Sequence, residues 1–149
     1  MTKTAIFAAG CFWGIEEKFL STDGVIETEV GYIGGKTPSP SYQDVCEGNT
    51  NHAEAVRVHY NEEKITYDSL LDIFFDIHDP TQLNRQGPDF GTQYRSEIFY
   101  LNTNQKEIAE KVIKLKNNDF SGKIVTKLSL LKNYCVAEEY HQKYLDKKF

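Results

Sequence analysis

The sequence predicts an α+β fold of the split β-α-β, ferredoxin-like kind, a two-layer sandwich in which helices pack on a mixed sheet. Stretches with strand and helix periods follow one another in the order β-α-β-β-α-β-α-β, and one more helix-like stretch comes last. This order is not the strict alternation of a parallel doubly wound sheet. The chain has 149 residues, which is the length of one domain with a sizeable core. Since no repeat or linker divides it, we expect a single domain over residues 1–149.

The first half of the chain contains the clearest elements. A continuous apolar run predicts a buried strand near the N-terminus, and the stretch after it has the period of an amphipathic helix. Alternating apolar residues predict two further strands. The elements expected here are strands at 4–9, 25–32 and 53–58, a helix at 12–20 and a short helical turn at 42–46. Residues 34–40 are rich in glycine and proline and predict a loop.

The second half predicts three helices and two strands. They are helices at 67–78, 105–116 and 137–145 and strands at 97–101 and 123–131. Asp79-Pro80 ends the first of these helices, because proline cannot continue it. Residues 81–93 form a polar connection that is long for a compact domain, and such loops usually carry function.

Composition and charge exclude several classes of function. The formal net charge is −5 and no basic block is present, which argues against nucleic acid or an anionic membrane as the main partner. The three cysteines are widely spaced and do not form a secreted disulfide framework. No apolar run approaches the length of a transmembrane helix or of a signal-peptide core. We therefore expect a cytoplasmic monomer whose partners are small molecules or other proteins.

The run Gly10-Cys11-Phe12-Trp13-Gly14 is the most informative part of the chain. It places a thiol between two glycines, next to the only tryptophan, where a predicted strand gives way to a predicted helix. Glycine permits tight turns and close approach, and the free N–H groups of a helix start favour a nearby anion such as a thiolate. Cys11 is therefore a candidate nucleophile rather than a buried small apolar residue, which is the common reading of a single cysteine.

The helix start activates this thiol only modestly. A helix N-terminus stabilises a nearby negative charge by roughly 0.3–2 kcal/mol, so it lowers a thiol pKa from about 8.5 to about 7.5. The apolar neighbours Phe12 and Trp13 oppose this, because they disfavour the charged form. We therefore expect Cys11 to need its substrate or a nearby proton donor in order to react.

Five segments of the chain, taken together, resemble peptide methionine sulfoxide reductase A. They are Gly10-Cys11-Phe12-Trp13-Gly14, Gly31-Tyr32-Ile33-Gly34-Gly35, the stretch from Tyr42-Gln43-Asp44-Val45-Cys46-Glu47-Gly48 to His52-Ala53-Glu54-Ala55-Val56, Gly87-Pro88-Asp89-Phe90-Gly91-Thr92-Gln93-Tyr94-Arg95-Ser96, and Ala137-Glu138-Glu139-Tyr140-His141-Gln142. They occur in the order of the family and cover nearly the whole chain. The resemblance implies an α+β fold around a split β-α-β core and reduction of methionine-S-sulfoxide, free or within proteins, to methionine.

The resemblance also implies roles for individual residues. Cys11 matches the nucleophile, and Phe12 and Trp13 match the walls of the pocket for the substrate methyl group. Three residues match the groups that hold the sulfoxide oxygen, namely Tyr42, Glu54 and Tyr94. Asp89 matches a position in the surround of the family's active site.

The chemistry of a sulfoxide needs these residue types. Its sulfur is a weak electrophile, so hydrogen bonds from two phenols and a proton from a carboxylic acid must draw charge onto the oxygen before Cys11 attacks. Glu54 fits this role only when protonated, and burial among apolar groups raises a carboxyl pKa enough to keep it neutral near pH 7. The products are methionine and a Cys11 sulfenic acid, which another thiol must reduce.

The source of that second thiol stays open. Many family members use a cysteine in a glycine-rich tail, and this sequence has none beyond Cys135. Cys46 matches a position at which the family often has a structural cysteine. Cys135 is a candidate resolving thiol, since exposure and proximity decide such exchange. The alternative that we favour is direct reduction by an external thiol, such as thioredoxin, glutaredoxin, glutathione or dithiothreitol, with no bound cofactor and no metal.

Other readings remain at this point. Taken singly, Glu54 is a solvent-facing strand residue, Tyr42 and Tyr94 are half-buried phenols, Trp13 belongs to the core, and Asp89 pairs with a base such as Arg95. The four histidines have no metal-like spacing and are interpreted as structural or exposed, namely His52, His59, His78 and His141. We expect His141 and Glu138 to tie the last helix to the domain. A cysteine-based peroxidase and a non-enzymatic module that binds methionine-containing segments are the competing functions.

Overall fold

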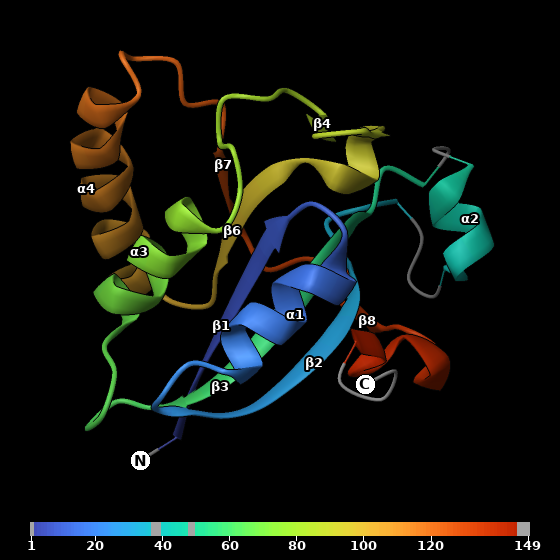
Figure 1. The fold of residues 1–149 in the computed structure, drawn as a ribbon, viewed down its shortest axis with the longest axis horizontal. Helices are drawn as coiled ribbons and strands as arrows, with labels where there is room; N and C mark the ends of the chain where they lie inside the picture. Colours follow the sequence, from blue (N-terminus) through green and yellow to red (C-terminus); the bar gives the residue numbers. More distant parts are fainter. Residues whose placement is uncertain (1, 37–39, 48–49, 146–149) are drawn as a thin grey trace.

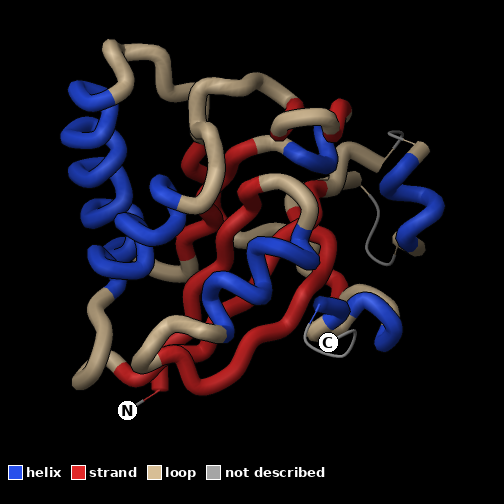
Figure 2. Tube along the Cα trace, in the orientation of Figure 1, coloured by secondary structure: helices blue, strands red, loops and turns tan. Residues whose placement is uncertain are grey.

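The computed structural model describes residues 2–36, 40–47 and 50–145, arranged as helices on a mixed sheet (Figures 1 and 2). The strands are β1 (Thr2–Ala9), β2 (Val25–Ile33), β3 (Ala53–Asn61), β4 (Arg85–Gln86), β5 (Asp89–Phe90), β6 (Ser96–Tyr100), β7 (Lys127–Leu130) and β8 (Cys135–Val136). The helices are α1 (Phe12–Leu20), α2 (Tyr42–Cys46), α3 (Tyr67–Asp76) and α4 (Thr103–Asp119), with 3-10 turns η1 (Thr92–Tyr94) and η2 (Glu139–His141).

The main sheet has six strands in the order β7-β6-β1-β3-β2-β8. Strands β1 and β2 are both antiparallel to β3, which lies between them, so they run in the same direction. Helix α1 joins them across the face of the sheet (Figure 1). Strand β6 is antiparallel to β1, and β6–β7 is the one parallel pair among the described strands. The sheet is therefore mixed, as expected.

The two faces of the sheet are covered differently. One face packs against α1 and α3 in the larger core, where Phe7 of β1 stacks on Phe19 of α1 at 5.3 Å and contacts Phe74 of α3 at 5.4 Å between ring centroids. The opposite face carries a smaller cluster that includes Ile6, Ala8 and Phe99, with Tyr134 packed against it. The alternation of β1 side chains between the two clusters follows from the period of two in a strand.

Most predicted elements are confirmed, with shifts of a few residues at their ends. Helix α1 and helix α2 have the predicted bounds. Helix α2 begins with a capping box, in which the Ser41 hydroxyl accepts from the Asp44 N–H and the Asp44 carboxylate accepts from the Ser41 N–H. The strand expected at 123–131 is shorter, since only Lys127–Leu130 pairs with β6. Residues 37–39 of the loop expected at 34–40 lie outside the described residues, as does Gly48.

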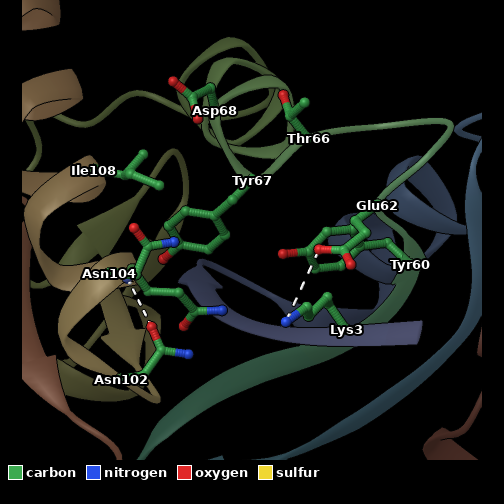
Figure 3. A pocket seen from close by; sticks show the side chains of 10 residues that line it. Lys3, Tyr60, Glu62, Thr66, Tyr67, Asp68, Asn102, Asn104 and Ile108 are labelled. Carbon is green, nitrogen blue, oxygen red and sulfur yellow. Dashed lines mark hydrogen bonds and ion pairs between the residues drawn. The ribbon is translucent and has the colours of Figure 1, made fainter. Parts of the chain in front are cut away.

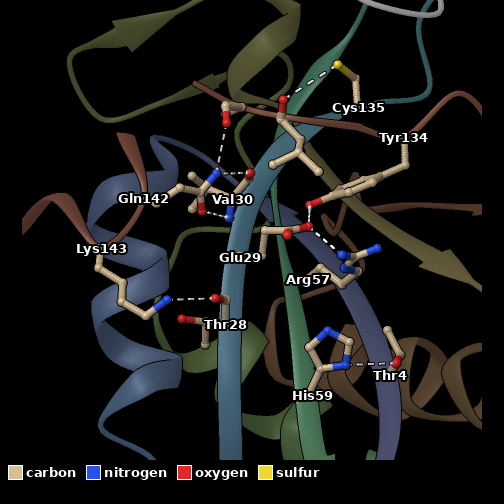
Figure 4. Close-up of polar contacts among 12 residues, drawn as sticks. Thr4, Thr28, Glu29, Val30, Arg57, His59, Tyr134, Cys135, Gln142 and Lys143 are labelled. Atoms are coloured by element: carbon tan, nitrogen blue, oxygen red, sulfur yellow. Dashed lines mark hydrogen bonds and ion pairs between the residues drawn. The ribbon is translucent and has the colours of Figure 1, made fainter. Parts of the chain in front are cut away.

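The helix predicted at 137–145 is wrong over most of its length. Within it, Glu139–His141 form only the 3-10 turn η2, and the Ala137 N–H donates to the Val30 carbonyl, which continues the pairing of Cys135 and Val136 with β2. The side-chain amide of Gln142 then accepts from the Val30 N–H at 2.8 Å and donates to the Val30 carbonyl at 2.9 Å (Figure 4). The polar groups of β2 thus find partners in this segment, and tertiary hydrogen bonds outweigh its local helix preference.

The long connection at 81–93 contains a small hairpin rather than only irregular loop. Strands β4 and β5 pair Gln86 with Asp89 and Arg85 with Phe90. The turn η1 follows and leads directly into β6. Among the described residues, no helix is long and apolar enough to cross a membrane.

His78 fixes the end of α3 to the sheet. Its Nδ1 lies 2.6 Å from the Phe74 carbonyl, which can only accept, so Nδ1 carries the proton and Nε2 accepts from the Ser96 hydroxyl at 2.8 Å. The Thr126 hydroxyl lies 2.7 Å from the Ser96 hydroxyl and completes the chain of hydrogen bonds. Burial lowers the pKa of His78 from 6.5 to about 4, which keeps the ring neutral in this arrangement.

This network predicts a pH-dependent contribution to stability. Between pH 6.5 and 4 the unfolded chain binds a proton at His78 that the folded chain does not, so stability is lost as pH falls. The loss reaches about 2 kcal/mol by pH 5. We expect the difference in free energy of unfolding between the native protein and His78→Asn, measured in urea at pH 7 and pH 5, to shrink by about that amount. A difference that is the same at both pH values would contradict this.

Candidate active site

Cys11 lies at the N-cap of α1, in the turn that follows β1. Gly10 before it has a φ of 109°, a backbone conformation that L side chains rarely adopt, and a Cβ placed there would lie 2.9 Å from Cγ of Gln86. Glycine at position 10 is therefore required both by the turn and by its neighbour. The second glycine of the motif is different, because a Cβ at Gly14 would meet no atom within 4 Å.

Burial decides the state of the Cys11 thiol. Hydrogen bonds from the N–H groups of Trp13 and Gly14 lower its pKa, as expected for a helix start, but desolvation is larger and the carboxyl groups of Glu54 and Asp89 add to it. Together they raise the pKa of Cys11 from 9.0 to about 11. The apolar surroundings thus win over the helix dipole, and Cys11 is a thiol at neutral pH.

Glu54 projects from β3 next to this turn. Its side chain is only 1 % exposed, so the reading of a solvent-facing strand residue is wrong. Oε1 accepts from the N–H of Phe12 at 3.3 Å, while Oε2 has no hydrogen-bond partner among the described residues. Desolvation raises the pKa of Glu54 from 4.5 to about 8 despite the Phe12 N–H, with Asp89 as a smaller cause. A buried carboxylic acid with one unpartnered oxygen therefore lies beside the nucleophile.

The other predicted polar groups converge on Cys11 and Glu54 from separate elements. Tyr42 comes from α2, Asp89 from β5 and Tyr94 from η1. Burial and then the Glu54 carboxyl raise the pKa of Tyr94, with smaller contributions from Cys46, Asp89 and Cys11. Burial also raises the pKa of Tyr42, whose hydroxyl bonds the Cys46 thiol. Both phenols are thus protonated donors next to the acid.

The alternative interpretation of Asp89, an ion pair with Arg95, is wrong. The Arg95 guanidinium instead forms a buried ion pair with Glu97 at 2.7 Å.

The aromatic residues of the motif form one cluster with the C-terminal segment. Phe12 is 1 % exposed, and its ring lies 5.7 Å from that of Tyr32 and 5.2 Å from that of His141. Trp13 is only partly buried, and its ring stacks on Tyr144 with 4.0 Å between centroids. Trp13 therefore presents an aromatic surface beside Cys11, whereas Phe12 lies deeper.

Glu138 holds the C-terminal segment against this cluster. One carboxylate oxygen accepts from the Tyr32 hydroxyl and the other from the Tyr42 N–H, at 2.8 and 2.9 Å. These hydrogen bonds, with that of the Tyr42 N–H first, hold the pKa of Glu138 below its usual value although burial raises it. Glu138 thus ties β2 and α2 to the segment that carries His141, and the prediction that Glu138 and His141 tie this region to the domain is confirmed.

His141 is the residue of the site that the sequence interpretation missed. Its Nδ1 accepts from the Trp13 indole N–H at 2.9 Å, so the proton of the neutral ring is on Nε2. That Nε2 is buried and has no partner among the described residues, and its ring lies 4.3 Å from that of Tyr42. A buried donor without a partner, set among the aromatic side chains of the site, makes His141 a candidate contact for a ligand. The resemblance gave the position of His141, but no spacing in the sequence indicated this free donor.

The two other cysteines differ in their relation to the site. All three cysteines are free. Cys46 is exposed on α2 and accepts from the Tyr42 hydroxyl. Cys135 lies opposite Tyr32 in the register of β8 with β2, and its thiol donates to the Val136 carbonyl at 3.6 Å (Figure 4). Burial raises the pKa of Cys135, with Glu138 as the second cause, so the reactive form of the thiol is scarce.

A cavity of about 220 Å³ lies elsewhere, at the far end of β1 (Figure 3). Lys3 and the first turns of α3 and α4 line it, while Cys11 follows the other end of this eight-residue strand. A strand of that length spans about 25 Å. This cavity is therefore separate from the groups around Cys11.

Comparisons with known proteins agree with this site. The chain is 61 % identical over 144 residues to the peptide methionine sulfoxide reductase MsrA of Pelagibacter ubique (strain HTCC1062), covering 97 % of this chain and 98 % of that protein. Its structure is similar to the crystal structure of Mxr1 from Saccharomyces cerevisiae in reduced form, with a TM-score of 0.93, 44 % identity and coverage of 98 % of this chain and 85 % of the other.

A second solved structure and a family model complete the comparison. Mxr1 from Saccharomyces cerevisiae in complex with Trx2 matches with a TM-score of 0.68 and 29 % identity, over 96 % of this chain and 84 % of the other. The model of the peptide methionine sulfoxide reductase family matches residues 3–149. With a thiol at a helix start, a protonated carboxyl group beside it and this match over almost its whole length, the chain belongs to the peptide methionine sulfoxide reductase A family.

Proposed function

We propose that Cys11 and Glu54 carry out the thiol-dependent reduction of methionine-S-sulfoxide, free or within oxidised proteins, to methionine. The reduction of methionine sulfoxide is the activity of the family, and it makes the chain an oxidoreductase that repairs proteins after oxidative stress. The observation that carries the residue assignment is Glu54 itself. Its pKa of about 8 leaves a proton on a carboxyl group that is buried beside the nucleophile.

The proposed step moves one oxygen atom. Glu54 gives its proton to the sulfoxide oxygen, which makes the substrate sulfur electrophilic, and the Cys11 sulfur attacks it as its own proton leaves. The attack forms a transient bond between the two sulfur atoms. The hydroxyl group then moves to the Cys11 sulfur, so a Cys11 S–O bond forms while the substrate S–O bond and the transient S–S bond both break, and the proton released by the thiol restores Glu54. The substrate sulfur gains two electrons and becomes methionine, while Cys11 loses two and becomes a sulfenic acid.

The surrounding groups bind and orient the substrate. The hydroxyl groups of Tyr42 and Tyr94 donate to the sulfoxide oxygen, for which the Tyr42 hydroxyl turns away from Cys46. The exposed part of Trp13 receives the S-methyl group, with Phe12 behind it, and a sulfur–aromatic contact contributes roughly 0.3–1.5 kcal/mol. The unpartnered Nε2–H of His141 and the carboxylate of Asp89 are available to polar groups of the substrate backbone.

The proposed cycle closes with an external thiol. A thioredoxin-type reductant is supported by the similar structure of Mxr1 in complex with Trx2, and glutaredoxin, glutathione and dithiothreitol are chemically equivalent donors. One thiol displaces water from the Cys11 sulfenic acid to give a mixed disulfide, and a second releases Cys11. No bound cofactor or metal takes part in this scheme. Resolution by Cys135 is the alternative, and the burial that raises its pKa disfavours it.

We also propose the finer description of the molecule. Residues 1–149 form a single catalytic domain of the split β-α-β, ferredoxin-like class, which the β6-β1-β3-β2 order of the central strands and the crossover α1 support. The enzyme acts as a monomer in the cytoplasm, where a reducing environment suits three free cysteines.

The assignment of substrate and residues is tested with separated epimers. We expect methionine to form from the S epimer of methionine sulfoxide and not from the R epimer, with dithiothreitol as reductant, and Cys11→Ser to abolish the reaction. Glu54→Gln keeps the shape of the acid without its transferable proton, so the rate falls by about 10²–10⁴-fold while substrate binding changes little. Faster oxidation of Cys11 by hydrogen peroxide than by either epimer would instead support a peroxidase.

The raised pKa of Cys11 is tested by alkylation with iodoacetamide in a Cys46→Ser/Cys135→Ser background. With a pKa of about 11, the thiolate fraction and the alkylation rate rise about tenfold per pH unit from pH 7 to 10. Above pH 8 the Glu54 carboxylate raises this pKa, so Glu54→Gln lowers it. Glu62→Gln, at the far end of the molecule, is the matched control. A plateau of the rate below pH 9 in the parent protein would refute the raised pKa.

The resolving thiol is tested by mass after one turnover without reductant. Direct reduction by an external thiol predicts a stable Cys11 sulfenic acid, with the protein heavier by one oxygen atom. A species lighter by two hydrogens that persists in Cys46→Ser and is absent from Cys135→Ser would show instead that Cys135 resolves it.

A further inference from the structure

Gln86 has no role in the mechanism proposed above, yet it contacts residues close to the candidate active site. It lies in β4, on the long connection that the sequence marked as functional, and its neighbours come from three parts of the site. Its side-chain amide bonds Asp79, three residues after the end of α3, its methylene groups lie on the turn before Cys11, and its partner across the hairpin is Asp89.

The amide of Gln86 is fixed at both ends by one residue. Oε1 accepts from the Asp79 N–H at 2.8 Å and Nε2 donates to the Asp79 carbonyl at 2.9 Å. The side-chain amide thus bonds the N–H and the C=O of one residue, as a neighbouring strand would do with its backbone. Such a contact needs a group that both donates and accepts. A carboxylate or an aliphatic side chain at position 86 cannot form both bonds.

The methylene groups of Gln86 face Gly10. A Cβ at Gly10 would lie 2.9 Å from Cγ and 3.0 Å from Cβ of Gln86, so the glutamine occupies the space that a side chain at position 10 would need. Interiors transmit such contacts because they are closely packed. The position of the hairpin is thus set directly against the turn that presents Cys11.

Asp89 is the charged group that this contact places. It pairs with Gln86 in the register of β4 with β5, and the hairpin is braced again where the Gly87 N–H donates to Gln82 at 2.7 Å. The charge of Asp89 acts on both Cys11 and Glu54. The other titratable groups that face these two residues come from different elements: Tyr32 on β2, Tyr42 and Cys46 on α2, and Tyr94 on η1.

We propose that Gln86 is a positioning residue of the reaction, which holds Asp89 beside Cys11 and Glu54 by fixing the β4–β5 hairpin between Asp79, just after α3, and the turn at Gly10. Gln86 touches neither the thiol nor the acid, and it acts through the placement of Asp89. The inference rests on the roles proposed above for Cys11 and Glu54.

The test measures whether the effect of Asp89 depends on Gln86. Gln86→Met keeps side-chain bulk against Gly10 but loses both bonds to Asp79. The readout is the pKa of the Cys11 thiol from the pH dependence of its alkylation, in the background without Cys46 and Cys135. We expect Asp89→Asn to lower this pKa in the parent protein, and to lower it by roughly half as much or less in Gln86→Met, because the carboxylate has moved away.

Controls separate positioning from a general loss of structure. Leu83→Ala alters an exposed side chain of the same connection and should leave the effect of Asp89→Asn unchanged. A merely structural Gln86 would lower the melting temperature without changing that effect. An equal shift from Asp89→Asn with and without Gln86 therefore overturns the proposal. Since alkylation needs no sulfoxide, this result is distinct from a failure of the epimer assay, which would overturn the proposed function instead.

Discussion

The burial of one carboxyl group in the middle of the sheet is the constraint on which the site depends. Glu54 lies on β3, which runs between β1 and β2, and its backbone pairs with Tyr32 of β2. Within the described part of the chain no cation contributes to its pKa and its one hydrogen-bond partner is the N–H of Phe12, so the group is stable at neutral pH only with its proton in place. That N–H belongs to the residue after Cys11, so the hydrogen bond that holds the acid also fixes it next to the nucleophile.

The same surroundings raise the pKa of the Cys11 thiol, whereas nucleophilic attack is faster from the thiolate. Burial outweighs the backbone N–H groups at the start of α1 and leaves Cys11 protonated at neutral pH. Acid and nucleophile are therefore both uncharged before substrate binds. Because a charged pair would have to be desolvated, this resting state is the cheaper one, and the sulfoxide oxygen supplies the acceptor that the acid lacks. Activation of the electrophile replaces activation of the thiol, and a scarce thiolate reacts slowly with other oxidants.

The C-terminal segment from Glu138 to Gln142 is held against the site by side-chain hydrogen bonds rather than by a regular helix or strand. Glu138 receives hydrogen bonds from β2 and α2, Gln142 pairs with the backbone of Val30, and His141 accepts the indole proton of Trp13. These contacts span 96 to 128 residues of sequence, and they bring the unpartnered Nε2 of His141 into the aromatic cluster. The β4–β5 hairpin also contributes side chains to the site, with Gln86 packed on Gly10 and the charge of Asp89 acting on Glu54.

The sequence by itself determined the order and nearly the bounds of the longer helices and strands up to Leu130, because the apolar period of each is a local property. It did not determine the β4–β5 hairpin or η1, which lie in the predicted connection at 81–93 and just after it. It also determined Cys11 at a helix start and, through the resemblance, the set of residues around it. Only the tertiary structure decided the rest. The segment predicted as a helix at 137–145 forms only a 3-10 turn at Glu139–His141, because Ala137 and Gln142 form hydrogen bonds with Val30 of β2. The pKa of Cys11 is raised because burial, which no local pattern measures, exceeds the effect of the helix start. The free donor of His141 and the contact of Gln86 with Gly10 join residues far apart in the chain, so they exist only once the chain has folded.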